Sequence, residues 1–417
     1  MLNRFRPAKR PGHPSYSERA CWPQRYRKGV LSGILLLLLC LGLVACATPF
    51  GGGSQATPTA GAATPTAGGA TATATQSVLL GPRPCPTAVQ SPAYWSGIVH
   101  TVAGVTSVAR VQCANLMGTP ELQALVTVTH QGGHALDVHV YTHITNPNPQ
   151  QIFQLLNLYD GDAVISGYNT VLTAEVNQNS ALNRGRSPAN YQRDLFREFK
   201  WSDAQQTLVQ IAFPGFFPDL TRYQAEADQA AVNQGHDPWK LDAIKVAQAL
   251  AASSSFFNWG ADAPARLISG GGQHDLNAVV EVKSLHPGGS TIRVSMSRLE
   301  SNTNGGIWEV TDVSSPTLSI SSPTSLARLH SPTTVTGRGP AFEGVIGSLR
   351  LLDHLYNQVG QAQVRGASGN GATTFSTSLS YTTDFSAGAQ EGLLMLSTPS
   401  QADGSIATGT LLKVLLT

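Results

Sequence analysis

The chain has 417 residues, which is too long for one ordinary hydrophobic core and indicates two or three domains. Charged residues make up only 12% of it, and the abundance of Gly, Thr, Ser and Pro favours short strands and turns over long charged helices. Residues 1–45 contain eight Lys or Arg and one Glu, so their +7 within an overall +2 leaves −5 for the rest. Because the remainder is not basic, we expect no nucleic-acid partner.

The N-terminal segment is typical of a secretory signal. A basic, Pro-rich stretch precedes an apolar run, residues 31–44, that is too short to span a membrane comfortably. The run ends in the sequence LVAC, residues 43–46, which resembles the lipobox of bacterial lipoproteins. That resemblance implies a signal peptide over residues 1–45, cleavage before Cys46, and acylation of the Cys46 thiol and amine. Several acyl chains would hold the protein on the extracellular face of the membrane. A short signal-anchor helix is the alternative.

Residues 46–77 are rich in Thr, Ala, Pro and Gly and contain no charge and almost no large apolar side chain. Such a segment cannot bury enough apolar surface to offset the entropy lost on ordering. We therefore predict a disordered tether with a reach of roughly 30 Å, which would lift the folded part clear of the membrane.

The cysteines divide between the predicted anchor and the folded part. Cys21 and Cys40 lie in the predicted signal peptide, and Cys46 would carry lipid. Cys85 and Cys113 remain as an even pair in an oxidising compartment, for which a disulfide is the expected state and two buried free thiols the alternative. No CxxC or nearby Cys/His spacing is present, so we predict neither a metal site nor a cofactor.

Residues 78–217 have the pattern of an antiparallel β-rich domain. Two apolar segments flank a Gly-rich turn at residues 131–133, the chain turns again at Asp160 and Gly161, and residues 191–213 read as a further hairpin. This layout is similar to meanders or propeller-like blades, but no motif assigns it to a family.

One strand of this region carries four polar side chains that we expect on one face: Asp137, His139, Tyr141 and His143. His139 and His143 would stand roughly 13 Å apart along a strand, too far to share one zinc ion. A wet polar face on a half-buried strand is the favoured interpretation, and an ion held with ligands from another strand is the alternative.

Two further stretches offer alternatives of their own. Asp160 and Asp162 flank Gly161 and suit either a hairpin turn, which we favour, or the start of a calcium loop. Residues 213–220, FPGFFPDL, combine three aromatic rings with two prolines. They are either an exposed recognition loop or a buried plug between domains.

Residues 218–315 predict a central α+β domain. A helical section runs from about Arg222 to Trp259, with Asp237 as the N-cap and Pro238 at the first helical position of its second helix. Apolar residues then alternate with polar ones in three strands, the last of which follows a turn at Gly305 and Gly306. The apolar sets at helical or strand spacing are Leu241, Ile244, Ala247 and Ala251; Ala278, Val280 and Val282; Ile292, Val294 and Met296; Trp308 and Val310.

Residues 316–417 show turn signals every ten residues or so and no helix signal, which predicts a β-sandwich. Pro332 would start a strand, Gly337 and Gly339 would relieve a tight turn, Phe342 would enter the core, and Glu343 would point outward or cap backbone N–H groups. The fold class expected for the whole chain is multidomain and mainly β, with the central α+β domain and this sandwich.

The C-terminal segment is also similar to a known family. Its S-P-x-x-V-x-G…F-E-G order, from Ser331 to Gly344, together with Asp353, Phe375 and the closing strand around Val414, resembles the immunoglobulin-like domain of bacterial spore-germination proteins and surface lipoproteins. The stretch after Asp353 departs from the family's pattern because it lacks a neat two-residue turn. The resemblance implies an immunoglobulin-like β-sandwich serving as an accessory extracellular module.

No motif for a zinc protease, a nucleophile elbow or a phosphate-binding loop occurs in the chain. We therefore expect a non-enzymatic, lipid-anchored surface protein that binds a cell-wall polymer or an envelope protein, and the resemblance adds a link to spore germination. An extracellular hydrolase with a dispersed acidic site is one alternative. A substrate-binding lipoprotein of a transporter is another, although that class has two α/β lobes.

Overall fold

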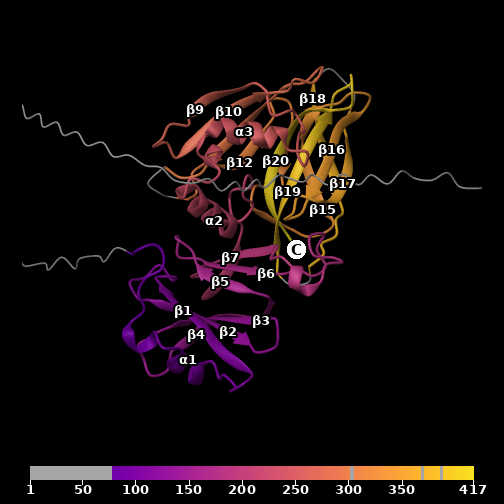
Figure 1. Cartoon of the computed structure of the whole chain (residues 1–417). Coiled ribbons are helices and arrows are strands. Elements are labelled where there is room, and N and C mark those ends of the chain that lie inside the picture. Colours follow the sequence, from indigo (N-terminus) through magenta and orange to yellow (C-terminus); the bar gives the residue numbers. More distant parts are fainter. Residues whose placement is uncertain (1–77, 301–304, 368–370, 386–387) are drawn as a thin grey trace, which may run out of the picture. The chain divides into compact units, whose positions relative to one another are not determined.

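The structure is a computed structural model that describes residues 78–417 except 301–304, 368–370 and 386–387. The predicted signal peptide, Cys46 and the tether lie outside the described residues. The described chain is multidomain and mainly β, as predicted, and its strands form several antiparallel sheets (Figure 1). In the described part, no helix is long and apolar enough to cross a membrane.

The first sheet is a meander of four antiparallel strands, and it contains the hairpin predicted at residues 131–133. A 3-10 helix, Thr87–Val89, and helix α1, Pro92–Ile98, precede it. The fully buried Trp95 of α1 packs on Tyr141 with ring centroids 5.1 Å apart. Cys85 and Cys113 are joined by a disulfide beside this ring. The strands, in sheet order, are β1 Thr106–Ala114, β2 Gln123–His130, β3 Ala135–Thr142 and β4 Gln150–Tyr159.

A second sheet of four antiparallel strands completes the predicted β-rich segment. Its strands are β5 Asp162–Ile165, β6 Val171–Glu175, β7 Leu195–Ser202 and β8 Thr207–Ile211. The last two are the hairpin predicted within residues 191–213. Apolar side chains of both sheets share one core, in which Phe153 of β4 meets Phe199 of β7 at 5.0 Å. The connection between β6 and β7 is long and contains a 3-10 helix, Pro188–Asn190.

The central helical section consists of α2, Arg222–Asn233, a 3-10 turn, Pro238–Leu241, and α3, Ala243–Ala252. The predicted N-cap at Asp237 is wrong, because Asp237 adopts a left-handed conformation and its side chain caps nothing. Asp242 is the cap of α3, and its carboxylate accepts hydrogen bonds from the backbone N–H groups of Ile244 and Lys245. The Asp-Pro signal therefore marks a short 3-10 turn that leads into the helix.

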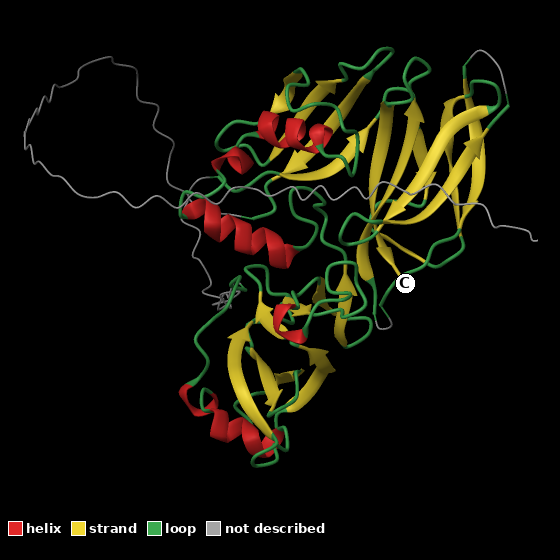
Figure 2. Ribbon diagram, turned by 45° about the vertical axis from the view of Figure 1, so that its right-hand side comes forward, coloured by secondary structure: helices red, strands yellow, loops and turns green. Residues whose placement is uncertain are grey.

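The alternation predicted after the helices is confirmed. In β10 and β11 the apolar residues face the core under α3, while Lys283 and Arg293 are exposed. The helix α3 lies across one face of these strands (Figure 2). Trp308 and Val310 are fully buried in the same core. The strands are β9 Ala265–Gly270, β10 Asn277–Lys283, β11 Thr291–Ser297 and β12 Glu309–Ser314.

The last quarter of the chain is sandwich-like, and none of its described residues is helical. A three-stranded sheet, β13 Ser319–Ser322, β15 Thr333–Pro340 and β18 Ala372–Leu379, packs against a sheet of longer strands across an apolar core. The longer strands are β16 Val345–Leu352, β17 Gln358–Arg365, β19 Gln390–Pro399 and β20 Ile406–Leu416, and the short β14 Ala327–Leu329 pairs parallel with β20.

The large sheet crosses the boundary predicted between residues 315 and 316. β20 pairs with β19 on one side and with β12 on the other, where Val313 stands opposite Leu411. The described residues from 78 onward accordingly belong to one compact unit. β19 is buried on both faces: Leu393 and Met395 belong to the core under α3, and Leu394 and Leu396 belong to the sandwich core.

The expectation that Phe342 enters the sandwich core is wrong, because its side chain is 60% exposed. Phe342 and Val345 exchange both backbone hydrogen bonds across a two-residue turn. Glu343 and Gly344 occupy the turn with φ values of 48° and 78°, both in the left-handed region. That geometry is a type I′ hairpin between β15 and β16, for which Asn-Gly and Asp-Gly are the usual signals. The Phe-Glu-Gly sequence is thus a turn rather than a buried strand.

The prediction that Gly337 and Gly339 relieve a tight turn is also wrong, because both lie within β15. A Cβ on Gly337 would come within 2.1 Å of the Ser319 carbonyl oxygen and 2.7 Å of the Phe375 ring. A Cβ on Gly339 would come within 2.6 Å of Ile346. Glycine is required here for close approach of neighbouring strands and rings. Pro332 does immediately precede β15, as predicted.

Candidate functional site

The polar residues predicted on one face of β3 each contact different partners and do not form one cluster. Asp137 accepts hydrogen bonds from His130, at 2.7 Å, and from the backbone N–H of Asn157, at 2.8 Å. His143 pairs with Glu121 at 2.9 Å. Among residues 78–417, apart from the three gaps, no group of three or more His, Cys, Asp and Glu is placed to hold a metal ion.

The predicted wet face of β3 is covered at one end. Tyr141 is buried under Trp95, and His139 stacks on Tyr141 with ring centroids 6.4 Å apart. Burial lowers the pKa of His139, against the opposing effects of Asp137 and Gln151. A neutral imidazole inside this polar and aromatic layer is consistent with a packing role.

Asp160 and Asp162 diverge from each other instead of forming a calcium loop. Asp160 pairs with His134 at 2.7 Å, and Asp162 accepts hydrogen bonds from Arg110 and from the Tyr223 hydroxyl group. Burial would raise the pKa of Asp162, but the contact with Arg110 outweighs it and the pKa is lowered. The favoured interpretation, a turn, agrees with the left-handed backbone of Asp160.

The aromatic segment at residues 213–220 is a buried plug rather than a recognition loop. Phe213 and Phe216 are fully buried, and Phe217 forms a β-bridge with Val310 of β12. The Phe213 ring lies between two cations, Arg222 at 5.0 Å and Lys413 at 5.9 Å. The plug thus sits where α2 meets the large sheet.

Two sets of buried charges surround this plug. In the first, Arg222 of α2 contacts Glu198 at 2.8 Å and Glu300 at 2.9 Å. Burial raises the pKa of Glu300 to about 8, although Arg222 opposes the shift. In the second, the fully buried Lys413 of β20 lies 3.3 Å from Glu391 of β19. Burial raises the pKa of Glu391 to about 7 and lowers that of Lys413.

Strongly shifted carboxyl groups are often catalytic, but these are enclosed. Glu309 has no exposed surface, and burial raises its pKa well above the ordinary value. Neither Glu309 nor the carboxyl groups of the two sets, Glu198, Glu300 and Glu391, line any of four depressions on the described surface. Their contacts join the β5–β8 sheet, α2 and the large sheet around the plug.

The strongest candidate site is the connection between β6 and β7, residues 177–194, which we call the arginine–tyrosine loop. Its two ends are fastened to each other from inside. The fully buried Asn183 donates to the carbonyl oxygens of Asn177 and Gln192 and to the Asp194 carboxylate. Asp194 also accepts from the backbone N–H of Asn177 at 2.8 Å. The loop is therefore a built structure despite its lack of regular strands.

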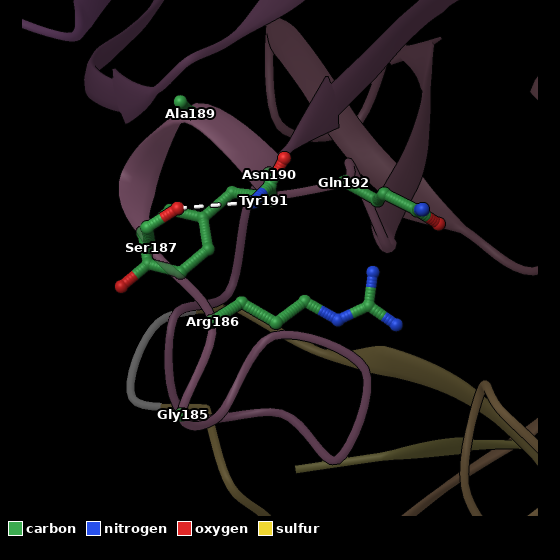
Figure 3. A pocket seen from close by; sticks show the side chains of 7 residues that line it. All are labelled: Gly185, Arg186, Ser187, Ala189, Asn190, Tyr191 and Gln192. Carbon is green, nitrogen blue, oxygen red and sulfur yellow. Dashed lines mark hydrogen bonds between the residues drawn. The ribbon is translucent and has the colours of Figure 1, made fainter.

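The outer part of the loop surrounds a depression of about 670 Å³ lined by residues 185–187 and 189–192 (Figure 3). The Arg186 guanidinium extends toward the Gln192 carboxamide, and the Tyr191 ring is turned away from both. Asn190 is held by a 3.0 Å hydrogen bond to Ser187. The side chains of Arg186, Tyr191 and Gln192 have no hydrogen-bond partner among the described residues, so their donors and acceptors remain available to a ligand.

The base of the loop is fixed to the sandwich-like part of the chain. Asn177 donates to the Asp384 carboxylate at 3.2 Å, and His354 contacts Asp194 at 3.3 Å. Burial alone would lower the pKa of His354, but the hydrogen bond to Asp194 and the charges of Asp353, Asp194 and Asp384 raise it. When protonated, His354 offsets part of the negative charge of these carboxylates beneath the loop.

We expect the stability supplied by His354 to fall as the pH rises. The folded-state pKa lies above the ordinary value of 6.5, so the contribution is complete below pH of about 6.5 and is lost as the pH passes through the folded-state pKa. Denaturant titrations from acid to mildly alkaline pH should show wild type losing its advantage over His354→Gln. The glutamine keeps a donor for Asp194 without titrating. Parallel pH profiles for the two proteins would contradict this assignment.

Comparison with protein-family models and with curated protein sequences finds no match for the chain. The loop also escaped prediction from the residues themselves, since it has no apolar period and no catalytic motif. A signal is nevertheless present: Arg184, Arg186 and Arg193 surround Tyr191 within a long polar connection between two strands. Long connections in compact domains are often functional, which makes such a cluster worth testing.

Proposed function

We propose that this protein is a non-enzymatic, lipid-anchored binding protein of the extracellular face of the cell membrane. The observation that carries the binding role is the arginine–tyrosine loop, whose depression offers an unpaired guanidinium, phenol and carboxamide on a fixed backbone. The lipobox resemblance at residues 43–46 supports the anchor. The resemblance of residues 316–417 to an immunoglobulin-like module of spore-germination and surface lipoproteins supports an accessory role in the envelope.

The competing functions have less support. For a hydrolase, the strongly shifted carboxyl groups are enclosed around Phe213 rather than placed at a surface depression. A transporter's substrate-binding lipoprotein has two α/β lobes, whereas this chain is mainly β. In this proposal the buried charges stabilise the fold around Phe213, and the arginine–tyrosine loop binds the ligand.

One set of cell preparations tests both parts of the proposal. Isolated cell walls should retain the full-length protein, and replacing residues 185–192 with a Gly/Ser sequence should abolish retention while the unfolding midpoint stays unchanged. In the same cells, Cys46→Ala should leave the chain uncleaved and free of acyl label. Wild-type protein that is never retained by walls or envelope proteins would defeat the binding role. A Cys46→Ala chain that is still cleaved and acylated would defeat the anchor.

A further inference from the structure

A second depression adjoins the first, and a pair of tyrosines stands between them. It measures about 250 Å³ and is lined by the β2–β3 turn, the turn after β4 and Arg193. Tyr159 at the end of β4 meets Tyr191 of the arginine–tyrosine loop with ring centroids 6.3 Å apart. His134 lines the second depression and stacks on Tyr159, which contacts Tyr191 of the first, so a chain of ring contacts joins the two depressions.

We propose that the two depressions bind consecutive units of a linear acidic glycan, one that carries carboxylate or phosphate groups along a sugar backbone. This inference rests on the proposed binding function and names the chemical class of its ligand.

The positive charge of three arginines on this surface favours an anionic ligand. Arg184, Arg186 and Arg193 form no ion pair with any described residue. Arg184 donates to the Asn179 carbonyl oxygen at 2.7 Å, and Arg193 donates to the carbonyl oxygens of Asp160 and Gly161. Carbonyl groups orient these guanidinium groups without cancelling their charge, which leaves donors suited to carboxylate or phosphate oxygens.

The three arginines outnumber the two nearby carboxylates, Asp160 and Asp194, and neither carboxylate forms an ion pair with them. Asp194 lies beneath the loop with His354, and Asp160 pairs with His134 at 2.7 Å. The net charge of the rim is therefore positive on a chain that is otherwise acidic after its first 45 residues.

The rings and amides supply the features that a sugar backbone needs. His134 stacks on Tyr159 at 5.3 Å, and Tyr159 contacts Tyr191 at 6.3 Å, so three aromatic rings in mutual contact connect the linings of the two depressions. Sugar rings pack their apolar faces on such rings, while their hydroxyl groups exchange hydrogen bonds with phenol and amide groups such as those of Tyr191 and Gln192. A simple inorganic anion would use only the arginines.

The site is pre-organised, which lowers the entropy lost on binding. Asn183 fastens the loop internally, and Arg193 fixes it to the turn after β4 through a 2.6 Å hydrogen bond to Asp160. Two depressions side by side favour a chain-like ligand over a single sugar, since a polymer can occupy both at once.

Three matched polymers test the proposal: neutral dextran, carboxymethylated dextran and phosphorylated dextran. Full-length protein in non-ionic detergent should bind at least one acidic form roughly tenfold more tightly than neutral dextran, with an affinity that falls as salt rises. Arg186→Gln and Tyr191→Ala should each weaken that binding by about tenfold. Arg338→Gln, at an exposed arginine of β15, is the matched control and should leave it unchanged.

Several results would overturn the inference. Equal affinity for neutral and acidic dextran would remove the requirement for an anion, and an unchanged affinity of Arg186→Gln would remove this loop as the site. Binding to phosphatidylglycerol vesicles that is lost in Arg186→Gln, without binding to either acidic dextran, would assign the patch to a membrane surface. Wall retention that depends on residues 185–192 but not on Arg186 would leave the proposed function standing while this inference fails.

Discussion

Replacing Lys413 with Ala is expected to lower the free energy of unfolding by about 3–5 kcal/mol, one of the largest effects available to a single substitution here. Lys413 is fully buried on β20 and lies 3.3 Å from Glu391. Its ammonium group also donates to the carbonyl oxygens of Gly215 and Leu220 in the plug segment. Truncation would therefore leave a buried carboxyl group and two carbonyl groups without their partner, next to a new cavity.

A second variant separates the charge from the packing. The double variant Lys413→Met with Glu391→Gln keeps the side-chain volumes and lets the amide oxygen accept from the Phe213 N–H, as Glu391 does at 3.0 Å. Because removing both partners of a buried ion pair is often nearly neutral, this protein should recover much of the stability lost by Lys413→Ala. Denaturant midpoints at constant slope measure both effects. A loss below about 1 kcal/mol for Lys413→Ala would show that the ion pair does not hold the plug in place.

Removing the disulfide between Cys85 and Cys113 is the second large effect, at about 3.5 kcal/mol in the chain-entropy model. The bond joins residues 28 apart and ties the segment that carries α1 to β1. Cys113 is itself buried beside Trp95. The double replacement Cys85→Ser and Cys113→Ser therefore also places a polar hydroxyl group in this small core and weakens its packing.

The disulfide prediction has a direct control in the reducing agent. Dithiothreitol should lower the denaturant midpoint of the wild-type protein toward that of the double Ser variant, and it should leave the variant unchanged. Limited proteolysis should then cut near residues 100–104, between α1 and β1, faster in the variant. Identical midpoints for wild type and variant in oxidising buffer would mean that the bond contributes nothing to stability.

Prediction from sequence succeeded where one face of an element is buried. β10 and β11 alternate because α3 covers one side of the sheet, so Val280, Val282 and Val294 mark the core unambiguously. β19 and β20 are covered on both faces, and such strands have no period to read. The lysine within the apolar sequence TLLKVLL, Lys413, is the sequence feature that indicates a buried charge in β20.

The errors arose where several backbone geometries fit the same residues. Asp-Pro at residues 237 and 238 suits a helix start, yet the hydrogen bonds of α3 are capped by Asp242. Phe342 was expected in the core because Glu343-Gly344 is a weak turn signal compared with Asn-Gly or Asp-Gly. Gly337 and Gly339 looked like turn residues because nothing in the sequence shows that Phe375 and Ile346 press against them from other strands.

The candidate site could not be predicted from the sequence, for a different reason. Its residues become a site only when Asn183 and Asp194 close the loop and when Tyr159, far away in sequence, meets Tyr191. Contacts of that kind depend on the packing of the two four-stranded sheets, and local sequence patterns do not predict them.

The position of β20 also has a consequence for the order of synthesis. The strand closest to the C-terminus stands between β19 and β12 in the middle of the largest sheet. A growing chain therefore cannot complete this sheet before residues 406–416 of β20 have been synthesised. Until then the two hydrophobic cores to which β20 contributes are incomplete, so we expect the chain not to be fully folded. That property suits a protein which, as we propose, crosses a membrane before it folds.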